Sequence, residues 1–374
     1  MNRLLLQPTL RQGKPARSAP SQPPAAGTAV TIAVDLARSK WVYACRWDGA
    51  ERRRLSTPAG LCHLQALVGE YLPQSGTVTV VYEACGFGHQ IAWWVAAQPG
   101  ATVLVVAPST VEQAPGTRVK TDGHDAGALA FKAERGLLHS VYIPAPALHQ
   151  DRQLARTYAQ VCGDRRRAQV RLRLTFQEQG ALDAPARTAG WTALERWIAL
   201  QQATLPPPVR ACVAELLHQR AAAAASAQRL RTQLLALGRT APYRAVVDAL
   251  SAQPGVGRFT AGRVVLELGD ITRFPTAPSL AHYLGLTPAE ASSGATIRRG
   301  HTRKCGPGAV RGWLLQCAWV AIRPGGDAAL RAGFERLAPR LGRKRAIVAV
   351  ARRLALRLRA RWRAVLAAPP AAAP

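Results

Sequence analysis

The stretch TAVTIAVDLA (residues 28–37) decides the fold of the first third of the chain, because small and β-branched residues run without interruption up to Asp35. A short run of this kind predicts a buried strand. It is followed by KWVYACRWDG (residues 40–49), a second apolar run in which Asp48-Gly49 is a turn signal. Together the two runs predict the beginning of a sheet.

After these two runs, strand and helix patterns alternate as far as residue 140. Three more runs have strand character: ERRRLST (51–57), GTVTVVYEA (76–84) and ATVLVVAPS (101–109). Three segments have the features of helices: residues 58–72, with Pro58 as the first helical residue after a Ser-Thr cap, residues 88–98, and a segment that opens with Asp122. The order β-β-β-α-β-α-β-α predicts an α/β domain over residues 29–145.

The following half of the chain has a different character. Residues 146–242 hold little Gly and no strand runs, which predicts an all-α, coiled-coil-like arm that breaks at the three prolines 206–208. Residues 243–330 predict a mostly α C-terminal domain. In it the turn PGVG (residues 254–257) joins two helices, as in a helix-hairpin-helix element.

The two ends of the chain are polar. Residues 1–28, rich in Pro, Ser, Gln and Arg, predict a disordered leader. Residues 331–374 predict a basic helical tail, because residues 331–363 contain 12 Arg and Lys and one Glu. Such a helix can lie along the phosphate backbone of a nucleic acid, or its charged residues can simply face solvent.

The composition points to a polyanionic partner. The chain carries 50 Lys and Arg against 21 Asp and Glu, a net charge of +29. Because Lys and Arg displace counterions from phosphates, nucleic acid is the first candidate partner and an acidic membrane surface the second. The seven Cys are scattered and include no CxxC pair, which argues against a disulfide framework or a zinc site and favours a reducing cytoplasm. No apolar run is long enough to predict a membrane span or a signal peptide.

Four acidic residues lie at the ends of predicted strands or at the start of a predicted helix, positions from which they could form a metal site. Asp35 and Glu83 end predicted strands, and Asp122 and Asp125 open a predicted helix. Strand ends converge on one rim of an open α/β sheet, and carboxylate oxygens are the ligands of Mg²⁺ or Mn²⁺. Two such ions about 4 Å apart can clamp the attacking and leaving oxygens of a phosphodiester. Each acid alone has a plainer role, since Asp122 suits a helix cap and Asp125 a first-turn charge.

A polar, basic loop in the C-terminal domain is the second candidate site. Its sequence is SSGATIRRGHTRKCG (residues 292–306), and it has Ser292, Ser293, Arg298, Arg299, His301, Arg303 and Lys304. Such a loop can bring a hydroxyl to a phosphate amid positive charge, or it can grip DNA without covalent chemistry. The backbone N–H groups of PGVG can also meet a phosphate, although a plain helix-helix turn explains them too.

Three motifs resemble those of the DEDD transposases of the insertion-sequence-110 group: VDLARSKW (34–41), VYEACGFGHQIAWWV (81–95) and VKTDGHDAGALA (119–130). The resemblance implies a RuvC/RNase H-like catalytic domain over residues 29–145. It makes Asp35, Glu83, Asp122 and Asp125 the four catalytic acids that hold Mg²⁺ (or Mn²⁺). The D-x-x-D block, preceded by Lys120 and Thr121, is the most specific of the three motifs.

The C-terminal segment resembles the transposase domain of the same group. The resemblance implies that Ser293, directly before Gly, is the nucleophile, with Ser292 as the second choice. It also implies nucleic-acid contacts by basic residues of the loop and the next helix: Arg298, Arg299, Arg303, Lys304 and Arg311. The family's Lys-x-Gly-Asn element reads Lys304-Cys305-Gly306-Pro307 here. Pro307 lacks the amide side chain and the backbone N–H of Asn, which puts a local hydrogen bond, and with it full activity, in question.

The function that this resemblance implies is that of an insertion-sequence transposase, a DNA recombinase that excises and integrates its own element. It would act on DNA in the bacterial cytoplasm, associated with the nucleoid, guided by a structured RNA, as a homo-oligomer (dimer or tetramer). Two alternatives remain open at this point. One is a metal-dependent nuclease of the Holliday-junction-resolving kind, which cuts with water. The other is a nucleic-acid-binding protein with an inactive site.

Overall fold

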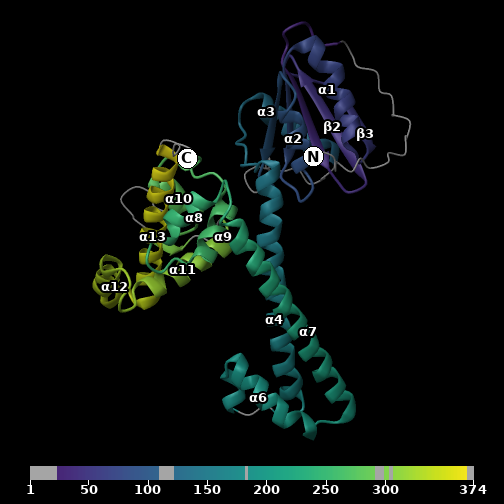
Figure 1. Ribbon diagram of the computed structural model, residues 1–374. Helices are drawn as coiled ribbons and strands as arrows, with labels where there is room; N and C mark the ends of the chain where they lie inside the picture. Colours follow the sequence, from purple (N-terminus) through teal and green to yellow (C-terminus); the bar gives the residue numbers. More distant parts are fainter. Residues whose placement is uncertain (1–22, 109–121, 182–183, 291–298, 303–305, 369–374) are drawn as a thin grey trace. The chain divides into compact units, whose positions relative to one another are not determined.

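The computed structural model describes residues 23–108, 122–181, 184–290, 299–302 and 306–368 of the chain. It divides into two compact units, Met1–Pro146 and Ala147–Pro374. The first unit is mixed α/β and the described part of the second is almost entirely helical (Figure 1). Within the described residues, no helix combines the length and the apolar character needed to cross a membrane.

The first unit is built on a five-stranded sheet with the order β3-β2-β1-β4-β5. Its strands are β1 (Val30–Leu36), β2 (Lys40–Trp47), β3 (Ala50–Pro58), β4 (Val78–Glu83) and β5 (Ala101–Val106). The first three strands form an antiparallel meander, and β4 and β5 run parallel to β1. The stretch 28–37 therefore contributes the central strand, with neighbours on both sides.

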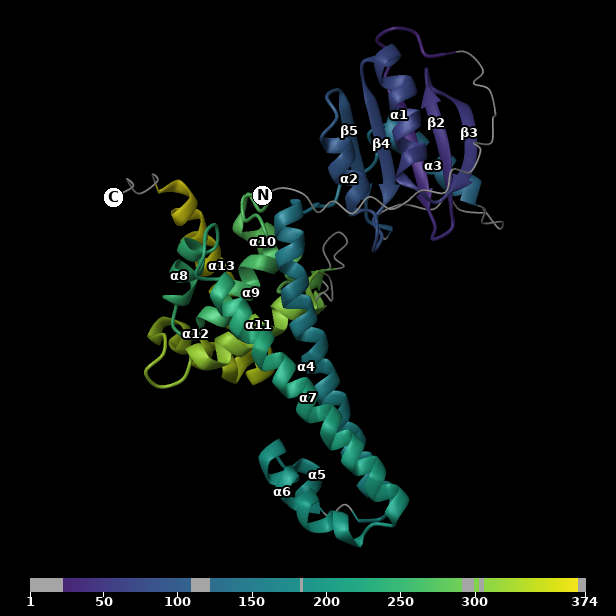
Figure 2. The ribbon, with the colours of Figure 1, turned by 45° about the vertical axis from the view of Figure 1, so that its right-hand side comes forward.

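Helices cover both faces of this sheet (Figure 2). One face packs on α1 (Leu61–Ser75) and α2 (His89–Ala96), and the other on α3 (Asp122–Glu134). The start of α1 differs from the prediction, because Thr57 and Pro58 pair with β2 as the end of β3. The helix begins three residues later, after Gly60.

Two long helices lie side by side as an arm in the second unit (Figures 1 and 2). They are α4 (Pro146–Glu178) and α7 (Pro207–Leu237), connected by α5 (Ala184–Thr188), α6 (Trp191–Gln201) and a short 3₁₀ turn, Gln202–Thr204. The three prolines start α7, with Pro206 at its N-cap, because proline is tolerated in the first turn of a helix but not in its interior. A small apolar core that includes Leu172, Phe176 and Leu194 holds the tip of the arm together.

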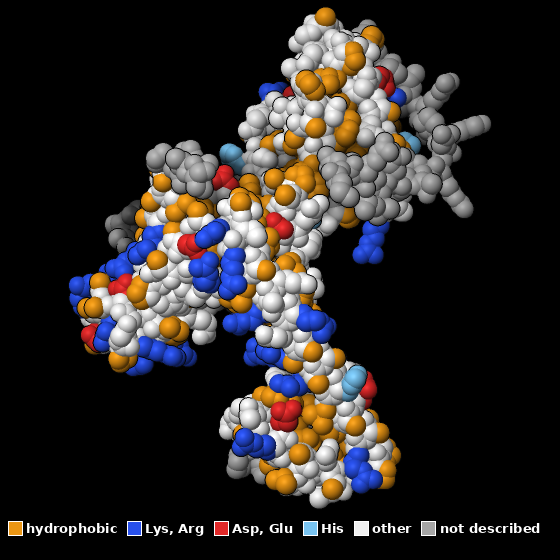
Figure 3. Space-filling view, in the orientation of Figure 1, with side chains coloured by type: hydrophobic (Ala, Val, Ile, Leu, Met, Phe, Trp, Pro, Cys, Tyr) orange, Lys and Arg blue, Asp and Glu red, His pale blue; other side chains and the backbone are white. Residues whose placement is uncertain are grey.

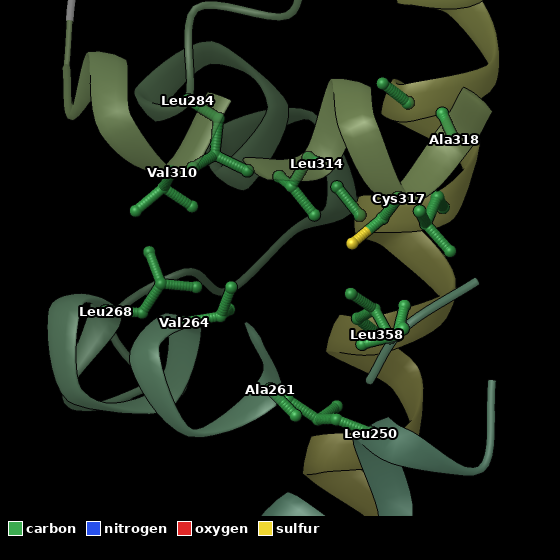
Figure 4. Packing of buried hydrophobic residues seen from close by; sticks show 14 of the residues in the cluster. Leu250, Ala261, Val264, Leu268, Leu284, Val310, Leu314, Cys317, Ala318 and Leu358 are labelled. Carbon is green, nitrogen blue, oxygen red and sulfur yellow. The ribbon is translucent and has the colours of Figure 1, made fainter. Parts of the chain in front are cut away.

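The remaining helices of the second unit share one larger core (Figure 4). They are α8 (Arg244–Ser251), α9 (Arg258–Leu268), α10 (Ala277–Tyr283), α11 (Gly308–Ala321), α12 (Ala328–Leu341) and α13 (Arg343–Ala367). The basic segment 331–374 thus includes most of α12 and all of α13. One face of α13 is buried in this core, through residues such as Leu354, Leu358 and Trp362. Ala155 of α4 and Leu234 of α7 belong to the same core, so the base of the arm is part of it.

Between α10 and α11 the chain forms two short antiparallel strands, β6 (Pro288–Glu290) and β7 (Arg299–Thr302). The sequence predicted only an irregular loop here, and β7 corrects that prediction. The two strands are joined by residues 291–298. This connecting segment contains Ser292, Ser293 and Arg298 and lies outside the described residues.

Candidate active site

The register of two parallel strands brings Asp35 and Glu83 to neighbouring positions. Val34 of β1 pairs with Tyr82 of β4, so the next residues along, Asp35 and Glu83, lie at the same level of the sheet. Side chains at the same level of adjacent parallel strands point to the same face. Both strands end within one residue of this point, which places the two carboxylates at the carboxyl edge of the sheet.

The pattern of burial identifies the face on which these two acids lie. Val34 and Tyr82 pack with α1 and α2, whereas Ala33 and Val81 pack with α3. Residues two apart in a strand share a face. Asp35 and Glu83 therefore point to the α3 face, where Asp35 is half-buried and Glu83 exposed.

The direction of α3 brings its first residues to the same edge. At its last residue, Glu134 accepts hydrogen bonds from Arg46 Nε (3.0 Å) and from the Gly49 amide (3.1 Å). Arg46 pairs with Thr31 at the beginning of β1, so the end of α3 lies at the amino edge. A helix packed along the strands from that point must begin at the carboxyl edge, where Asp122 is its first residue.

Asp125 lies one helical turn before Leu129, which is buried against the sheet, and its own side chain is exposed. The backbone thus brings all four acids to one edge of one face, while the side chain of Asp122 lies outside the described residues. Among the side chains that are described, no three His, Cys, Asp or Glu lie close enough to hold a metal ion. The donor set is nevertheless chemically suited to Mg²⁺, since it consists only of carboxylate oxygens.

The loop after Glu83 contains two residues, Phe87 and Gly88, that were not predicted as site residues from the sequence. The Tyr82 hydroxyl donates a hydrogen bond to the Gly88 carbonyl, and burial raises the pKa of this tyrosine. A Cβ at position 88 would lie 2.6 Å from the Tyr82 ring, so only glycine fits there. The anchored loop presents Phe87, with 47% of its surface exposed, close to the end of β4. The glycines flanking this aromatic residue were the available signal.

The turn between α8 and α9 is tightly fitted to a third helix. Gly255 has φ +90°, and a Cβ there would lie 2.6 Å from the Cys317 carbonyl oxygen of α11. Gly257 forms the N-cap of α9 in an extended conformation, with open space around it. The turn therefore combines one glycine required by packing with one that is free to face a ligand.

The structure places only part of the basic loop. Arg303 and Lys304, like the two serines, lie outside the described residues, and for Arg299 and His301 the backbone alone is described, in β7. Arg311 is half-buried in the first turn of α11. Pro307 is the N-cap of this helix and makes no side-chain capping bond. The position where the family has Asn is thus one at which an Asn side chain would cap a helix.

Comparison with known proteins agrees with these features. The model of the "Transposase IS116/IS110/IS902 family" matches residues 247–332, and a second model, the DEDD transposase domain of IS110, described as "Transposase", matches residues 32–179. The first runs from α8 to the start of α12, and the second covers the sheet with its four acids and α4. The five-stranded α/β unit is compatible with an RNase H-like N-terminal domain.

Three curated proteins are similar in sequence. A "Putative transposase y4qE" of Sinorhizobium fredii is 30% identical over 60% of this chain and 54% of its own length. A "Probable family 20 transposase" of Pseudomonas aeruginosa is 28% identical over 69% of this chain and 75% of its own. An "Insertion element IS110 uncharacterized 43.6 kDa protein" of Streptomyces coelicolor is 35% identical over 29% of this chain and 25% of its own. The chain thus spans about half the length of the first of these relatives. The two family matches, together with these relatives, show that the chain belongs to the IS110 family of DEDD transposases.

Proposed function

We propose that this protein is the transposase of an IS110-family element and that it excises and integrates that element by DNA strand exchange. The observation that carries the proposal is the register of β1 and β4, which puts Asp35 and Glu83 side by side on the face of the sheet covered by α3. Asp122 and Asp125 begin that helix at the same edge. Few acidic residues occur in this chain, so a gathering of four has a specific purpose.

In this proposal Asp35, Glu83, Asp122 and Asp125 hold Mg²⁺ or Mn²⁺ next to the scissile phosphate. The bound ion would supply charge stabilisation for the pentavalent phosphorus of the transition state. Phe87, in the loop that follows Glu83, is exposed and offers a flat apolar surface to a base of the bound DNA. The strongly basic chain neutralises the phosphates on either side of the cut.

Ser293 is proposed as the nucleophile. Its hydroxyl oxygen forms a bond to phosphorus while the bond from phosphorus to the DNA 3′ oxygen breaks, and the departing oxygen takes up a proton as the serine loses one. A 3′-hydroxyl of the exchanged strand then attacks the serine ester and releases the hydroxyl of Ser293. Bond number is conserved in both steps, so strand exchange needs no external energy source.

The proposal extends to partners. The DNA substrates are the element ends and the target, and a structured RNA would guide their choice. Because the acids and the serine loop belong to separate compact units, they can act on one phosphate from different subunits, which favours a dimer or tetramer. The protein would act in the cytoplasm on nucleoid DNA. These points rest on the family and on the charge of +29.

The decisive experiment compares strand exchange by the purified protein and three variants in the presence of Mg²⁺. Asp125→Ala and Ser293→Ala should each abolish product, while Asp164→Ala, an exposed acid of the arm paired with Arg167, should not change it. Ser292→Ala shows which of the adjacent serines reacts. A covalent protein–DNA adduct should form with the wild type and be absent with Ser293→Ala.

Other outcomes would support the alternatives. If DNA is still cut in a Mg²⁺-dependent way without Ser293 and Ser292, a nuclease that uses water replaces the serine mechanism. If the wild type binds DNA tightly but never cuts it, and Asp125→Ala behaves identically, the site is inactive.

A further inference from the structure

An open cavity of about 560 Å³ lies between α11, α12 and the beginning of α13. Its volume falls in the usual range of small-ligand sites. Two kinds of side chain line most of it, aromatic rings and guanidinium groups: Trp319, Phe334, Arg323, Arg331 and Arg343. Gln316, Ile322 and Glu335 complete the lining. None of these residues has a part in the proposed chemistry, although the C-terminal family match, residues 247–332, spans five of the eight.

The two rings form the apolar part of the cavity. Trp319 of α11 and Phe334 of α12 stand edge to face, with ring centres 5.6 Å apart. The guanidinium of Arg343 lies at a similar distance from both, 5.8 Å from the Trp319 ring centre and 5.6 Å from that of Phe334. An aromatic face with a planar cation beside it is the arrangement on which nucleic-acid bases stack.

The three arginines supply charge that the described part of the chain does not neutralise. None of Arg323, Arg331 and Arg343 has a carboxylate oxygen within 4.0 Å among the described residues. By contrast, Arg357, further along α13, pairs with Asp327. The lining thus holds three guanidiniums and one carboxylate, Glu335. Guanidinium donors that no described carboxylate neutralises are suited to a phosphate from outside.

The first turn of α13 adds to this charge. Arg343 is followed by Lys344 and Arg345, all three exposed, and that turn contains no acidic residue. Figure 3 shows Lys and Arg side chains gathered over this part of the unit, around α12. The charge therefore extends from the cavity to its surroundings, where the phosphates that flank a bound nucleotide would lie.

We infer that this cavity binds one unpaired nucleotide of a DNA or RNA strand. The base stacks on Trp319 beside Arg343, while the buried Phe334 ring packs edge to face against Trp319 and supports it, and the flanking phosphates contact the arginines. Gln316 and Glu335 can hydrogen-bond the base edge, with Glu335 accepting from an amino group. A base inside a duplex is stacked between its neighbours and cannot reach rings in a concave site, so the cavity selects an unpaired base. This inference adds a binding site to the proposed transposase and does not depend on its active site.

The test measures binding of short oligonucleotides to the full chain without Mg²⁺, so that Mg²⁺-dependent cleavage does not change the oligonucleotide during the measurement. Each oligonucleotide carries a single 2-aminopurine, whose fluorescence is quenched on stacking, and is prepared as single-stranded DNA, single-stranded RNA and duplex DNA. Arg343→Ala should weaken single-strand binding by about tenfold and reduce the quenching, with a much smaller effect on the duplex. Arg323 is also exposed, and Arg323→Ala should likewise weaken single-strand binding.

Arg336→Ala is the matched control, because Arg336 is an exposed arginine of α12 that does not line the cavity. It removes the same charge and should change single-strand and duplex binding equally and weakly. A strand with an abasic site in place of the 2-aminopurine distinguishes base recognition from phosphate recognition. The wild type should bind this strand as weakly as Arg343→Ala binds the intact strand.

The inference is overturned if Arg343→Ala and Arg336→Ala have equal effects, if duplex binding falls as much as single-strand binding, or if the abasic strand binds as well as the intact one. The last result would indicate a phosphate contact alone. Comparison of the DNA and RNA strands then shows which of them supplies the nucleotide.

Discussion

At the scale of the single residue, Gly255 shows how closely the turn between α8 and α9 is fitted to the core. Its Cβ position is occupied by atoms of α11, with the Cys317 oxygen at 2.6 Å and the Ala321 nitrogen at 2.8 Å. Its φ of +90° is also strained for any other residue. The turn can therefore form only with glycine at this position.

We expect Gly255→Ala to lower the free energy of unfolding by about 3 kcal/mol or more, from overpacking and backbone strain together. Gly257→Ala, two residues on, meets open space and has a negative φ, so its effect should stay below about 1 kcal/mol. Urea denaturation of both variants measures the difference. Equal losses would mean that the turn is not packed against α11 as described.

At the scale of the element, Asp327 ties three helices together. It caps α12 by accepting a hydrogen bond from the Leu330 amide (2.9 Å), and it also accepts from Gln253 (2.8 Å) after α8 and from Arg357 of α13. Burial alone would raise the pKa of Asp327, but these three donors together lower it. The ionised carboxylate is therefore a stabilising group of the C-terminal core.

The pKa of Asp327 sets the direction in which the free energy of unfolding changes with pH. Because the pKa of Asp327 is lower in the folded protein than its ordinary value of 3.8, its contribution is full above that pH and is lost as the pH falls through the folded pKa. Asp327→Asn keeps a capping oxygen but loses the charge, so at pH 7 it should unfold about 1–2 kcal/mol more easily than the wild type. This difference should shrink below pH 4. Thermal unfolding across pH 3–7 measures it.

Asp164→Asn is the control for this prediction. Asp164 is also an acid paired with an arginine, but both partners are more than half exposed, at 55% and 63%. Such a pair contributes little, so the variant should match the wild type within about 0.5 kcal/mol at every pH. A pH-independent loss in Asp327→Asn would show that the cap geometry matters and the charge does not.

The elements also show where sequence reasoning reaches its limit. The strands ending at Asp35 and Glu83 were predicted because apolar runs in a buried sheet are a local signal. The start of α1 was misplaced at Pro58, because only pairing with Lys40 in β2 shows that this proline still belongs to a strand. The burial of one face of α13 escaped notice because its many arginines dominate the composition.

At the scale of the whole molecule, the candidate site depends on contacts between distant segments. The sequence identified the four acids and predicted that the strand ends meet at one rim. The placement of Asp35 beside Glu83 could not be predicted, because it depends on β4 pairing with β1 rather than with β3, from which it follows in sequence. The cavity beside Trp319 escaped prediction for the same reason, since its lining comes from three helices.

The net charge of +29 acts on both binding and stability, and the two should respond to salt in opposite directions. Duplex DNA binding should weaken by about a thousandfold or more between 50 and 200 mM salt, as expected for roughly 6–10 phosphate contacts. Over the same range the free energy of unfolding should rise, because salt screens the repulsion among the positive side chains. Fluorescence anisotropy with a duplex and urea denaturation in matched buffers measure both. DNA affinity that is insensitive to salt would contradict the view that phosphate contacts by the basic surface hold this protein on DNA.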